Sequence, residues 1–274
     1  MEKEFTFVHA GIPAAAQQLL WAVFFVSRNR GVNLETHFPW IHETTGTTCI
    51  TLNRNTDLSF ESTMASLVIR DTTIAAVGQI GMLGLVCVKE EHRGQGLSSR
   101  LLFEAIRVSK SKRLDSLVLW TNKPEVYAKL GFVVDSSDKY GEVYKPHKKL
   151  TVSAVVYSKS MGRGGARNTA CGIPAFANEI FTLKTPKASL TALRVPNGIS
   201  VTEWHGDWDS IFELIENALP ETWMINAAET SEIFDEFDKR SYCYKVNISS
   251  LRMSKKLSKN YLPLIPYIPL LDRI

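Results

Sequence analysis

Four consecutive residues, Arg93, Gly94, Gln95 and Gly96, have the types needed to bind a phosphate group. Glycine lets the backbone turn sharply and lets a ligand approach closely. Apolar side chains at helical spacing begin at Leu97, so the first N–H groups of this helix lack intrahelical partners and lie at its positive end. With the guanidinium of Arg93, these groups predict a pyrophosphate-binding loop. A plain glycine turn with a solvated Arg93 is the alternative.

The loop differs from two common phosphate-binding motifs. The G-x-x-x-x-G-K-[ST] pattern does not occur in the sequence. Gly94 and Gly96 match the first two glycines of the dinucleotide fingerprint, but Ser99 replaces the third. The next strand ends in Thr121 and Asn122 and not in the acidic residue that would bind a ribose. Neither a P-loop nor a dinucleotide site is therefore expected.

A second segment, residues 118–134, is typical of a strand, a short helix and another strand. Asn122 can cap the helix, and Pro124 suits its first turn. Tyr127 lies inside this helix, and a tyrosine hydroxyl can protonate a leaving group. The alternative is a packed tyrosine whose hydroxyl is satisfied elsewhere.

Both segments need strands and helices to position them. Apolar, β-branched runs predict strands before residue 157, and 3.6-residue periods predict helices. The expected strands are 47–53, 65–70, 83–88 and 116–120, and the expected helices are 13–28, 97–109 and 124–130. Further along, we expect strands at 200–204 and 242–248 and helices at 210–219, capped by Asp209 or Ser210, and 231–240.

Taken together, the two segments resemble the GNAT superfamily of acyl-CoA-dependent N-acyltransferases. Glu91 to Leu97 matches the signature Q/E-x-x-G-x-G/A, and Tyr127 to Phe132 matches Y-x-K-L-G-F at the expected distance. The resemblance covers roughly residues 5–150. It implies an α/β fold with a GNAT-like mixed β-sheet flanked by helices.

The resemblance also implies a cofactor, acetyl-CoA, with coenzyme A leaving as the thiol. The backbone at the strand end would bind the pantetheine arm, the glycine loop would bind the pyrophosphate, and Asn122 would touch the arm near the thioester. Tyr127 would face the leaving sulfur as the catalytic acid. The cofactor-binding residues are then Val86, Cys87, Val88, Arg93, Gly94, Gln95, Gly96, Leu97, Ser98 and Asn122.

The expected function is N-acetyl transfer from acetyl-CoA to a primary amine acceptor, by direct attack in a ternary complex. Residues 80–88 contain no carboxylate, so the general base is unassigned. His37, Glu43 and Glu61 are candidates. A catalytically silent acyl-CoA-binding or scaffold module is the alternative function, and an acyl group longer than acetyl stays open.

The composition of the chain limits which partners and which cellular location we expect. The chain has 274 residues, 45% of them hydrophobic, and a net charge of +4 with dispersed basic residues, so no nucleic-acid partner is expected. Four widely spaced cysteines predict reduced thiols and a cytoplasmic location. The longest apolar N-terminal run, residues 19–26, is too short to span a bilayer. No metal site is expected at residues 205–209, and the oligomeric state stays open.

The chain also shows a seam rich in Gly, Ser and Arg over residues 157–175. We predict an acyl-CoA-binding N-acetyltransferase domain over 1–156, a linker over 157–175, and a smaller C-terminal α+β domain over 176–274. The last region contains no R-G-x-G loop, so it would lack a cofactor site. One interpretation of it is a degenerate acyltransferase-like fold.

Overall fold

A computed structural model describes residues 4–75, 77–146, 155–163, 172–258 and 264–274. The first half of the chain contains six strands and four α-helices among these residues. The strands are β1 (Phe5–Ala10), β2 (Thr47–Asn53), β3 (Thr63–Ile74), β4 (Gly78–Val88), β5 (Ser116–Thr121) and β6 (Val133–Tyr144). The helices are α1 (Ala14–Phe24), α2 (Leu34–His37), α3 (Leu97–Ser111) and α4 (Pro124–Ala128).

The second half is mostly sheet, with two α-helices in its described part. Its strands are β7 (Ser158–Met161), β8 (Glu179–Lys184), β9 (Ala188–Val195), β10 (Gly198–Gly206), β11 (Thr222–Ala228) and β12 (Cys243–Lys256). Its helices are α5 (Trp208–Ala218) and α6 (Ile233–Lys239). Short 3-10 turns occur at Val26–Arg28, Glu90–His92 and Leu270–Asp272.

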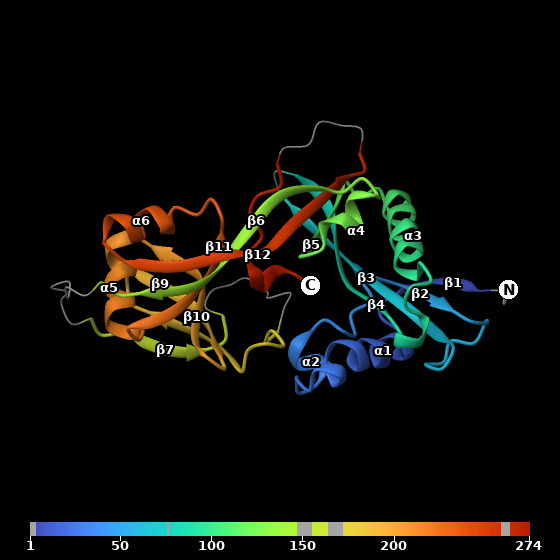
Figure 1. Ribbon diagram of the computed structural model, residues 1–274, viewed down its shortest axis with the longest axis horizontal. Helices are drawn as coiled ribbons and strands as arrows, with labels where there is room; N and C mark the ends of the chain where they lie inside the picture. The colour runs from blue at the N-terminus through green and yellow to red at the C-terminus, as the bar shows by residue number, and fades with distance from the viewer. Residues whose placement is uncertain (1–3, 76, 147–154, 164–171, 259–263) are drawn as a thin grey trace.

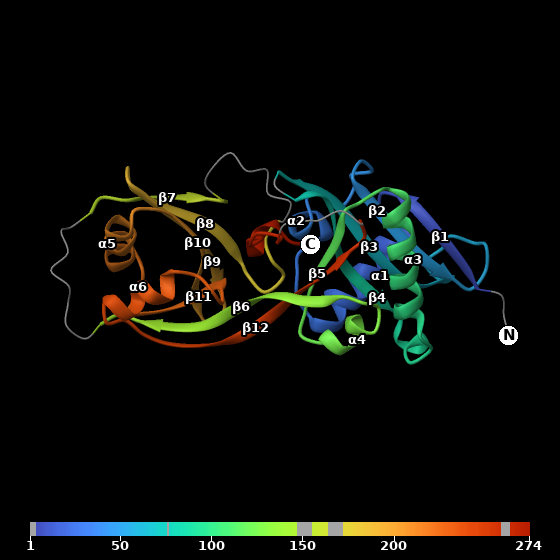
Figure 2. The same cartoon turned by 90° about the horizontal axis from the view of Figure 1, so that it is seen from above.

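All twelve strands belong to one mixed sheet. Their order is β1-β2-β3-β4-β5-β12-β6-β11-β10-β9-β8-β7. The long strands β6 and β12 pair with each other and run across the middle of the molecule, joining its two halves (Figures 1 and 2). The last described residues, around Ile274, lie between the halves.

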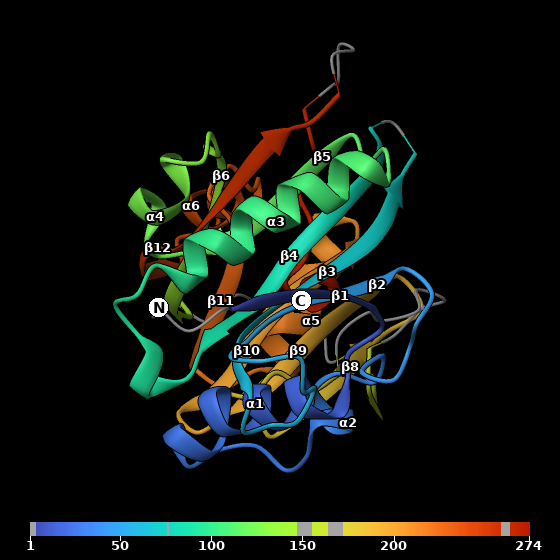
Figure 3. The ribbon, with the colours of Figure 1, turned by 90° about the vertical axis from the view of Figure 1, so that its right-hand side faces the viewer.

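Helices cover both faces of the sheet in the first half. Because successive strand residues face opposite sides, Ile50 packs on one face and Cys49 on the other. The first face is covered by α3 through its buried apolar stripe, which includes Leu101 and Leu102, and the second by α1 and α2 (Figure 3). On the second face, Ile265, Ile268 and Ile274 from the C-terminal segment pack against β4 and β5.

In the second half, α5 and α6 cover one face of the sheet. Phe212, Trp223 and Phe237 are buried between these helices and β9 to β11. Asp207 begins α5, because its side chain accepts a hydrogen bond from the Ser210 N–H at 2.9 Å. The opposite sheet face buries a smaller apolar cluster that includes Ile180 and Leu193. Met224, Ser200 and Asn226 on this face line cavities between the halves.

The two halves repeat one order of elements. The series β2-β3-β4-α3-β5-α4-β6 matches β8-β9-β10-α5-β11-α6-β12, and in both series the third and fourth strands pair in parallel. The final strands are exchanged, because β12 pairs with β5 and β6 pairs with β11. This repeated element order agrees with the interpretation of the second half as an acyltransferase-like fold. No exact sequence repeat indicated it.

Some sequence predictions need correction. Residues 158–161, expected in the linker, form β7 on the edge of the sheet. The helix expected over 13–28 ends at Phe24 and is followed by a separate 3-10 turn. Asp207, rather than Asp209 or Ser210, caps α5. Part of the predicted linker and Cys171 lie outside the described residues.

Candidate active site

The parallel strands β4 and β5 separate part-way along their length. They pair only between residues 80–82 and 116–118. Beyond these positions β4 continues to Val88 and β5 to Thr121 without pairing to each other. The outer edge of residues 83–88 therefore carries backbone N–H and C=O groups that no strand occupies, and an extended ligand can add there as a strand does.

A bulge in β4 marks the separation. Leu85 has φ of 52°, in the left-handed region, where a non-glycine residue costs about 1–2 kcal/mol. The register with β3 shifts at the same place, between Ser66 and Val68. The bulge re-aims the backbone around Val86, so N–H groups here can point toward a ligand instead of along the ladder. The sequence alone gave no sign of it.

The predicted arm-binding residues Val86, Cys87 and Val88 all lie on this end of β4. The Cys87 side chain is buried, with its sulfur 3.2 Å from the Ser66 hydroxyl. Burial raises the pKa of the Cys87 thiol to about 11, so this thiol is not a nucleophile near neutral pH. Only the backbone of Cys87 is available to bind a ligand.

The glycine loop joins β4 to α3. Gly94 and Gly96 have φ of 78° and 75°, and a Cβ on either would meet nothing within 4 Å. Glycine at these two positions therefore allows the positive φ angles and leaves open space over the loop. Among the described residues, none accepts a hydrogen bond from the N–H groups of residues 94–98. These donors are available to an anion.

The charges near the loop favour an anion. The first turn of α3 contains no acidic residue, and the half-exposed Arg93 is held only loosely, 3.9 Å from Glu90. Gln95 is exposed, while Leu97 is buried and fixes the start of the helix against the core. The predicted loop residues Arg93 to Gly96 are thus adjacent and exposed, and Ser98 is partly exposed.

Tyr127 lies in α4, next to β5. Its ring packs edge-on against Phe132, with 6.2 Å between ring centroids. No described residue forms a hydrogen bond with its hydroxyl, and burial raises the pKa of Tyr127. Both predicted roles of Tyr127 therefore stay predictions.

Asn122 is exposed at the end of β5, where the resemblance placed it. It does not cap α4, contrary to expectation. Lys123 holds the cap position without a side-chain bond, and the Thr121 hydroxyl accepts from the Lys123 N–H at 2.9 Å. The Asn122 amide is therefore not needed to begin the helix.

The candidate bases are engaged elsewhere. Nδ1 of His37 lies 2.6 Å from the Ile173 carbonyl oxygen and Nε2 lies 3.1 Å from the Val32 N–H, so both ring nitrogens have backbone partners. Glu43 pairs with Arg70 at 3.2 Å. Glu61 is exposed, and neither glutamate lines the cavities described below.

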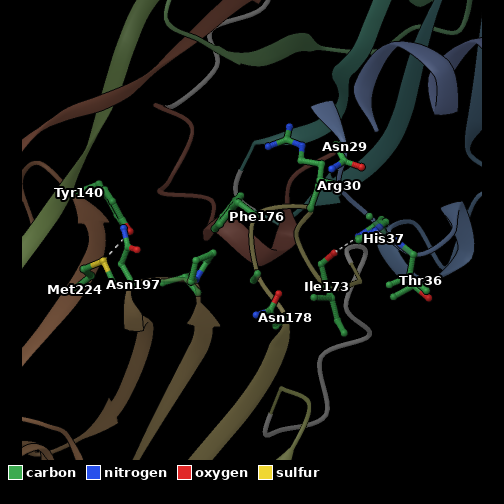
Figure 4. A pocket seen from close by; sticks show the side chains of 16 residues that line it. Asn29, Arg30, Thr36, His37, Tyr140, Ile173, Phe176, Asn178, Asn197 and Met224 are labelled. Carbon is green, nitrogen blue, oxygen red and sulfur yellow. Dashed lines mark hydrogen bonds between the residues drawn. The ribbon is translucent and has the colours of Figure 1, made fainter. Parts of the chain in front are cut away.

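Two cavities lie between the halves on the face of the sheet opposite α3. The first, of about 820 Å³, lies between residues 29–37 of the first half and β9 to β11 (Figure 4). His37 forms part of one wall, and Tyr140 and Met224 form part of the other. The Tyr140 hydroxyl donates a hydrogen bond to Sδ of Met224 at 3.0 Å. In this view Phe176 lies between those walls.

The second cavity, of about 570 Å³, shares Tyr140 and Phe176 with the first. It reaches the separated strands, because Trp120 of β5 and Ile274 both line it. Ile274 packs so closely on β4 that a Cβ added to Gly84 would lie 2.7 Å from its side chain. The second cavity therefore reaches β5 through Trp120, and Ile274 lies between it and β4.

One carboxylate lines the second cavity among the described residues, and it is paired. Asp138 accepts two hydrogen bonds from Arg273, one of them at 3.0 Å from Nη2. The same guanidinium lies 4.7 Å from the ring centroid of Trp120. Asn226 also lines the cavity and is 7% exposed, and its Oδ1 has no hydrogen-bond partner among the described residues.

Separated parallel strands and an open glycine loop at a helix N-terminus are the features that the GNAT resemblance implies. A family model described as the acetyltransferase (GNAT) domain matches residues 62–134. The N-terminal half of this chain therefore carries a GNAT domain. A search among curated proteins finds no match to the sequence.

Solved structures share the fold over nearly the whole chain. A probable N-acyltransferase of unknown function from Enterococcus faecalis aligns with a TM-score of 0.61 and 10% identity, covering 92% of this chain and 72% of that one. A putative acetyltransferase from Pyrococcus horikoshii gives 0.53 and 12%, covering 98% and 91%. A tandem GNAT protein from the clavulanic acid biosynthesis pathway gives 0.56 and 8%, covering 94% and 100%. At these identities the likeness shows a shared GNAT-like fold.

Sequence reasoning missed the residues of the second cavity. Trp120, Asn226 and Arg273 come from three distant strands and segments, and nothing in their spacing links them. A buried asparagine among strand residues was the one available signal, in the run Met224 to Ala228.

None of the helices in the described part of the chain is long and apolar enough to cross a membrane.

Proposed function

We propose that this protein transfers an acetyl group from acetyl-CoA to a primary amine by direct attack in a ternary complex. The observation that carries the proposal is the separation of β4 and β5 next to an open glycine loop, with a cavity lined by Trp120 of β5 and by Ile274. A cofactor arm lying in the gap would present its thioester to an amine in the cavity. The GNAT domain match supports an acyl-CoA donor.

In this proposal the cofactor residues act through backbone and charge. Edge groups of Val86 to Val88 bind the pantetheine arm, and the unpaired N–H groups of residues 94–98 with Arg93 bind the pyrophosphate. Asn122 contacts the arm beyond the end of β5. When bound, acetyl-CoA supplies the activated acyl group.

The amine must lose a proton before it attacks. An alkyl amine has a pKa near 10.4, so deprotonation at pH 7 costs about 3 units, or roughly 4 kcal/mol. The second cavity is largely apolar, and an apolar environment favours the neutral amine. This desolvation supports amine attack without a dedicated carboxylate, since Asp138 is already paired with Arg273.

The departing thiolate needs a proton, and Tyr127 is the proposed donor. Its hydroxyl has no partner among the described residues, and burial raises its pKa, so it stays protonated at neutral pH. A backbone N–H near the Leu85 bulge is the proposed partner of the tetrahedral oxyanion.

A catalytically silent acyl-CoA-binding module is the second candidate. The observation favouring it is the lack of an unpaired side-chain carboxylate or a free histidine among the described residues that line either cavity. Thiol release from acetyl-CoA in the presence of a mixed panel of primary amines tests the two. Amine-dependent release supports the transferase, whereas tight CoA binding without release supports the silent module.

The remaining parts of the proposal concern the chain as a whole. The second half serves the acceptor cavity and completes the sheet, while the first half binds the cofactor. Cys49, Cys87 and Cys243 are free, which supports a reducing, cytoplasmic compartment. No nucleic acid is proposed as a partner.

A further inference from the structure

The second cavity has a composition that selects among amines. Its walls include aromatic rings from the first half, Phe38, Trp120 and Tyr140, and Phe176 from the segment before β8. Pro174, Leu270 and Ile274 add further apolar surface. Flat, apolar groups gain most from such walls, through burial and through aromatic contact.

The charges of both cavities disfavour a polycation. In the described lining, the only side-chain carboxylate is Asp138, and Arg273 occupies both of its oxygens. The cationic side chains present are Arg273 and, in the first cavity, Arg30. An acceptor with several ammonium groups would lose hydration without meeting an unpaired side-chain carboxylate. An acceptor with one amine avoids that cost.

Asn226 adds a specific polar contact. Its Oδ1 is buried and accepts no hydrogen bond from any described residue, and Asn226 is one of the residues that line the second cavity. Buried acceptors are nearly always paired, so this oxygen is suited to a donor on a ligand. Ser200 on β10 and Ser250 on β12 add hydroxyls to the same wall.

The position of Asn226 fixes which end of the acceptor it meets. The strands β5, β12, β6 and β11 are consecutive in the sheet, so roughly 14 Å of sheet separates β5 from β11 at ordinary strand spacing. The acyl group reacts at the gap beside β5, whereas Asn226 lies on β11. A single amine nitrogen at the gap therefore lies far from Asn226.

We infer that the acceptor is an elongated monoamine with an aromatic body, whose far end donates a hydrogen bond to Asn226. This inference rests on the proposed function, because it places the amine against an acyl-CoA thioester. It goes further by naming a substrate class and a specificity-determining residue. The amine nitrogen attacks the thioester carbon, the C–S bond breaks, one amine proton is lost, and the thiolate takes up a proton.

The test is a homologous series of amines. The full-length protein is assayed with 4-hydroxyphenyl-alkylamines from ethyl to hexyl, each beside its phenyl analogue, and with spermidine. We expect an optimum length at which the hydroxyl raises kcat/KM by about threefold to tenfold, the usual effect of one neutral hydrogen bond. Asn226→Leu should abolish this preference while the phenyl analogue keeps its rate.

Controls separate specificity from stability. Asn217→Leu changes an exposed asparagine of α5 and should retain the hydroxyl preference. Asn226→Leu should melt no lower than the parent, since it removes an unpaired buried oxygen. Phe176→Ala alters a side chain that is 46% exposed, so the fold should survive while KM for aromatic amines rises.

Several results would overturn the inference. Spermidine as the better substrate would do so, as would an equal hydroxyl preference in the parent and Asn226→Leu. Faster turnover of decanoyl-CoA than acetyl-CoA, with Phe176→Ala reversing the order, would assign the cavity to an acyl chain instead. If no amine releases thiol, calorimetry with the hydroxylated amines and CoA decides. Binding then keeps the inference and removes the transferase proposal, whereas no binding removes both.

Discussion

Replacing Tyr127 by phenylalanine tests the proposed acid with little disturbance of the fold. The substitution keeps the ring, its place in α4 and its edge-on contact with Phe132. It removes a hydroxyl that no described residue bonds, so no partner is left unsatisfied. The free energy of unfolding should change by less than about 0.5 kcal/mol, in contrast with the 0.5–1.5 kcal/mol expected for a bonded hydroxyl.

The effect on turnover should be large. General acid catalysis typically contributes a factor of about 10²–10⁴, equivalent to roughly 3–5 kcal/mol in the barrier. Proton transfer from a tyrosine of pKa 10 to a thiolate of pKa 8.5 is uphill by about 1.5 units, or roughly 2 kcal/mol. Burial raises the pKa of Tyr127 and adds to that cost. Transfer must therefore accompany breakage of the C–S bond, when the sulfur is more basic.

The assay is thiol release from acetyl-CoA with an acceptor found in the amine panel. We expect kcat of Tyr127→Phe to fall by about 10²–10⁴ while CoA affinity and the melting temperature stay near those of the parent. Tyr144→Phe is the matched control, because its hydroxyl donates to Glu142 on β6, away from the gap. Turnover within a factor of about two of the parent would refute the reasoning and leave Tyr127 as a packing residue.

Three other outcomes follow from the structure. Gly94→Val should weaken CoA binding in calorimetry, and Gly162→Val, also at positive φ with nothing within 4 Å of its Cβ, should have the same strain of about 1–2 kcal/mol without that effect. Residues 1–156 expressed alone should be insoluble, because the pairing of β12 with β5 is lost. A monodisperse, folded fragment in gel filtration would contradict this. The melting temperature should fall as pH rises above about 10, because burial raises the pKa of Tyr127, Tyr140 and Tyr267 and the unfolded chain releases those protons first. A melting temperature that stays constant between pH 9 and 11 would contradict this expectation.

Local signals in the sequence predicted the cofactor half of the fold well. The strand at 47–53 and the helix beginning at Leu97 agree with the structure because alternation and helical periods survive in a single sequence. The same signals failed for β1, which alternates between half-buried and exposed residues on the sheet edge. The strands β8, β9 and β11 were also missed.

What the sequence could not show is long-range pairing. The exchange of β6 and β12 joins residues 133–144 to 243–254, and no local period encodes a partner strand. The positive φ of Leu85 is another case, since leucine carries no preference for that conformation. The second cavity depends on both features, so its residues could not be assembled from motifs.

The two repeats share one architecture but differ where a cofactor would bind. In the second repeat β10 and β11 also separate, after pairing only at residues 200–201 and 224–225. There β10 leads almost directly into α5 through Asp207, with Asp209 in the first helical turn, so negative charge stands where the first repeat has Arg93. Tyr267 and Pro269 line the small cavity beside that gap. Because an anion at that helix end would meet two carboxylates, the second gap is unsuited to a pyrophosphate. The repeat instead contributes β12 to the sheet and Asn226 to the cavity wall, which explains why a second half without a glycine loop can still serve the proposed reaction.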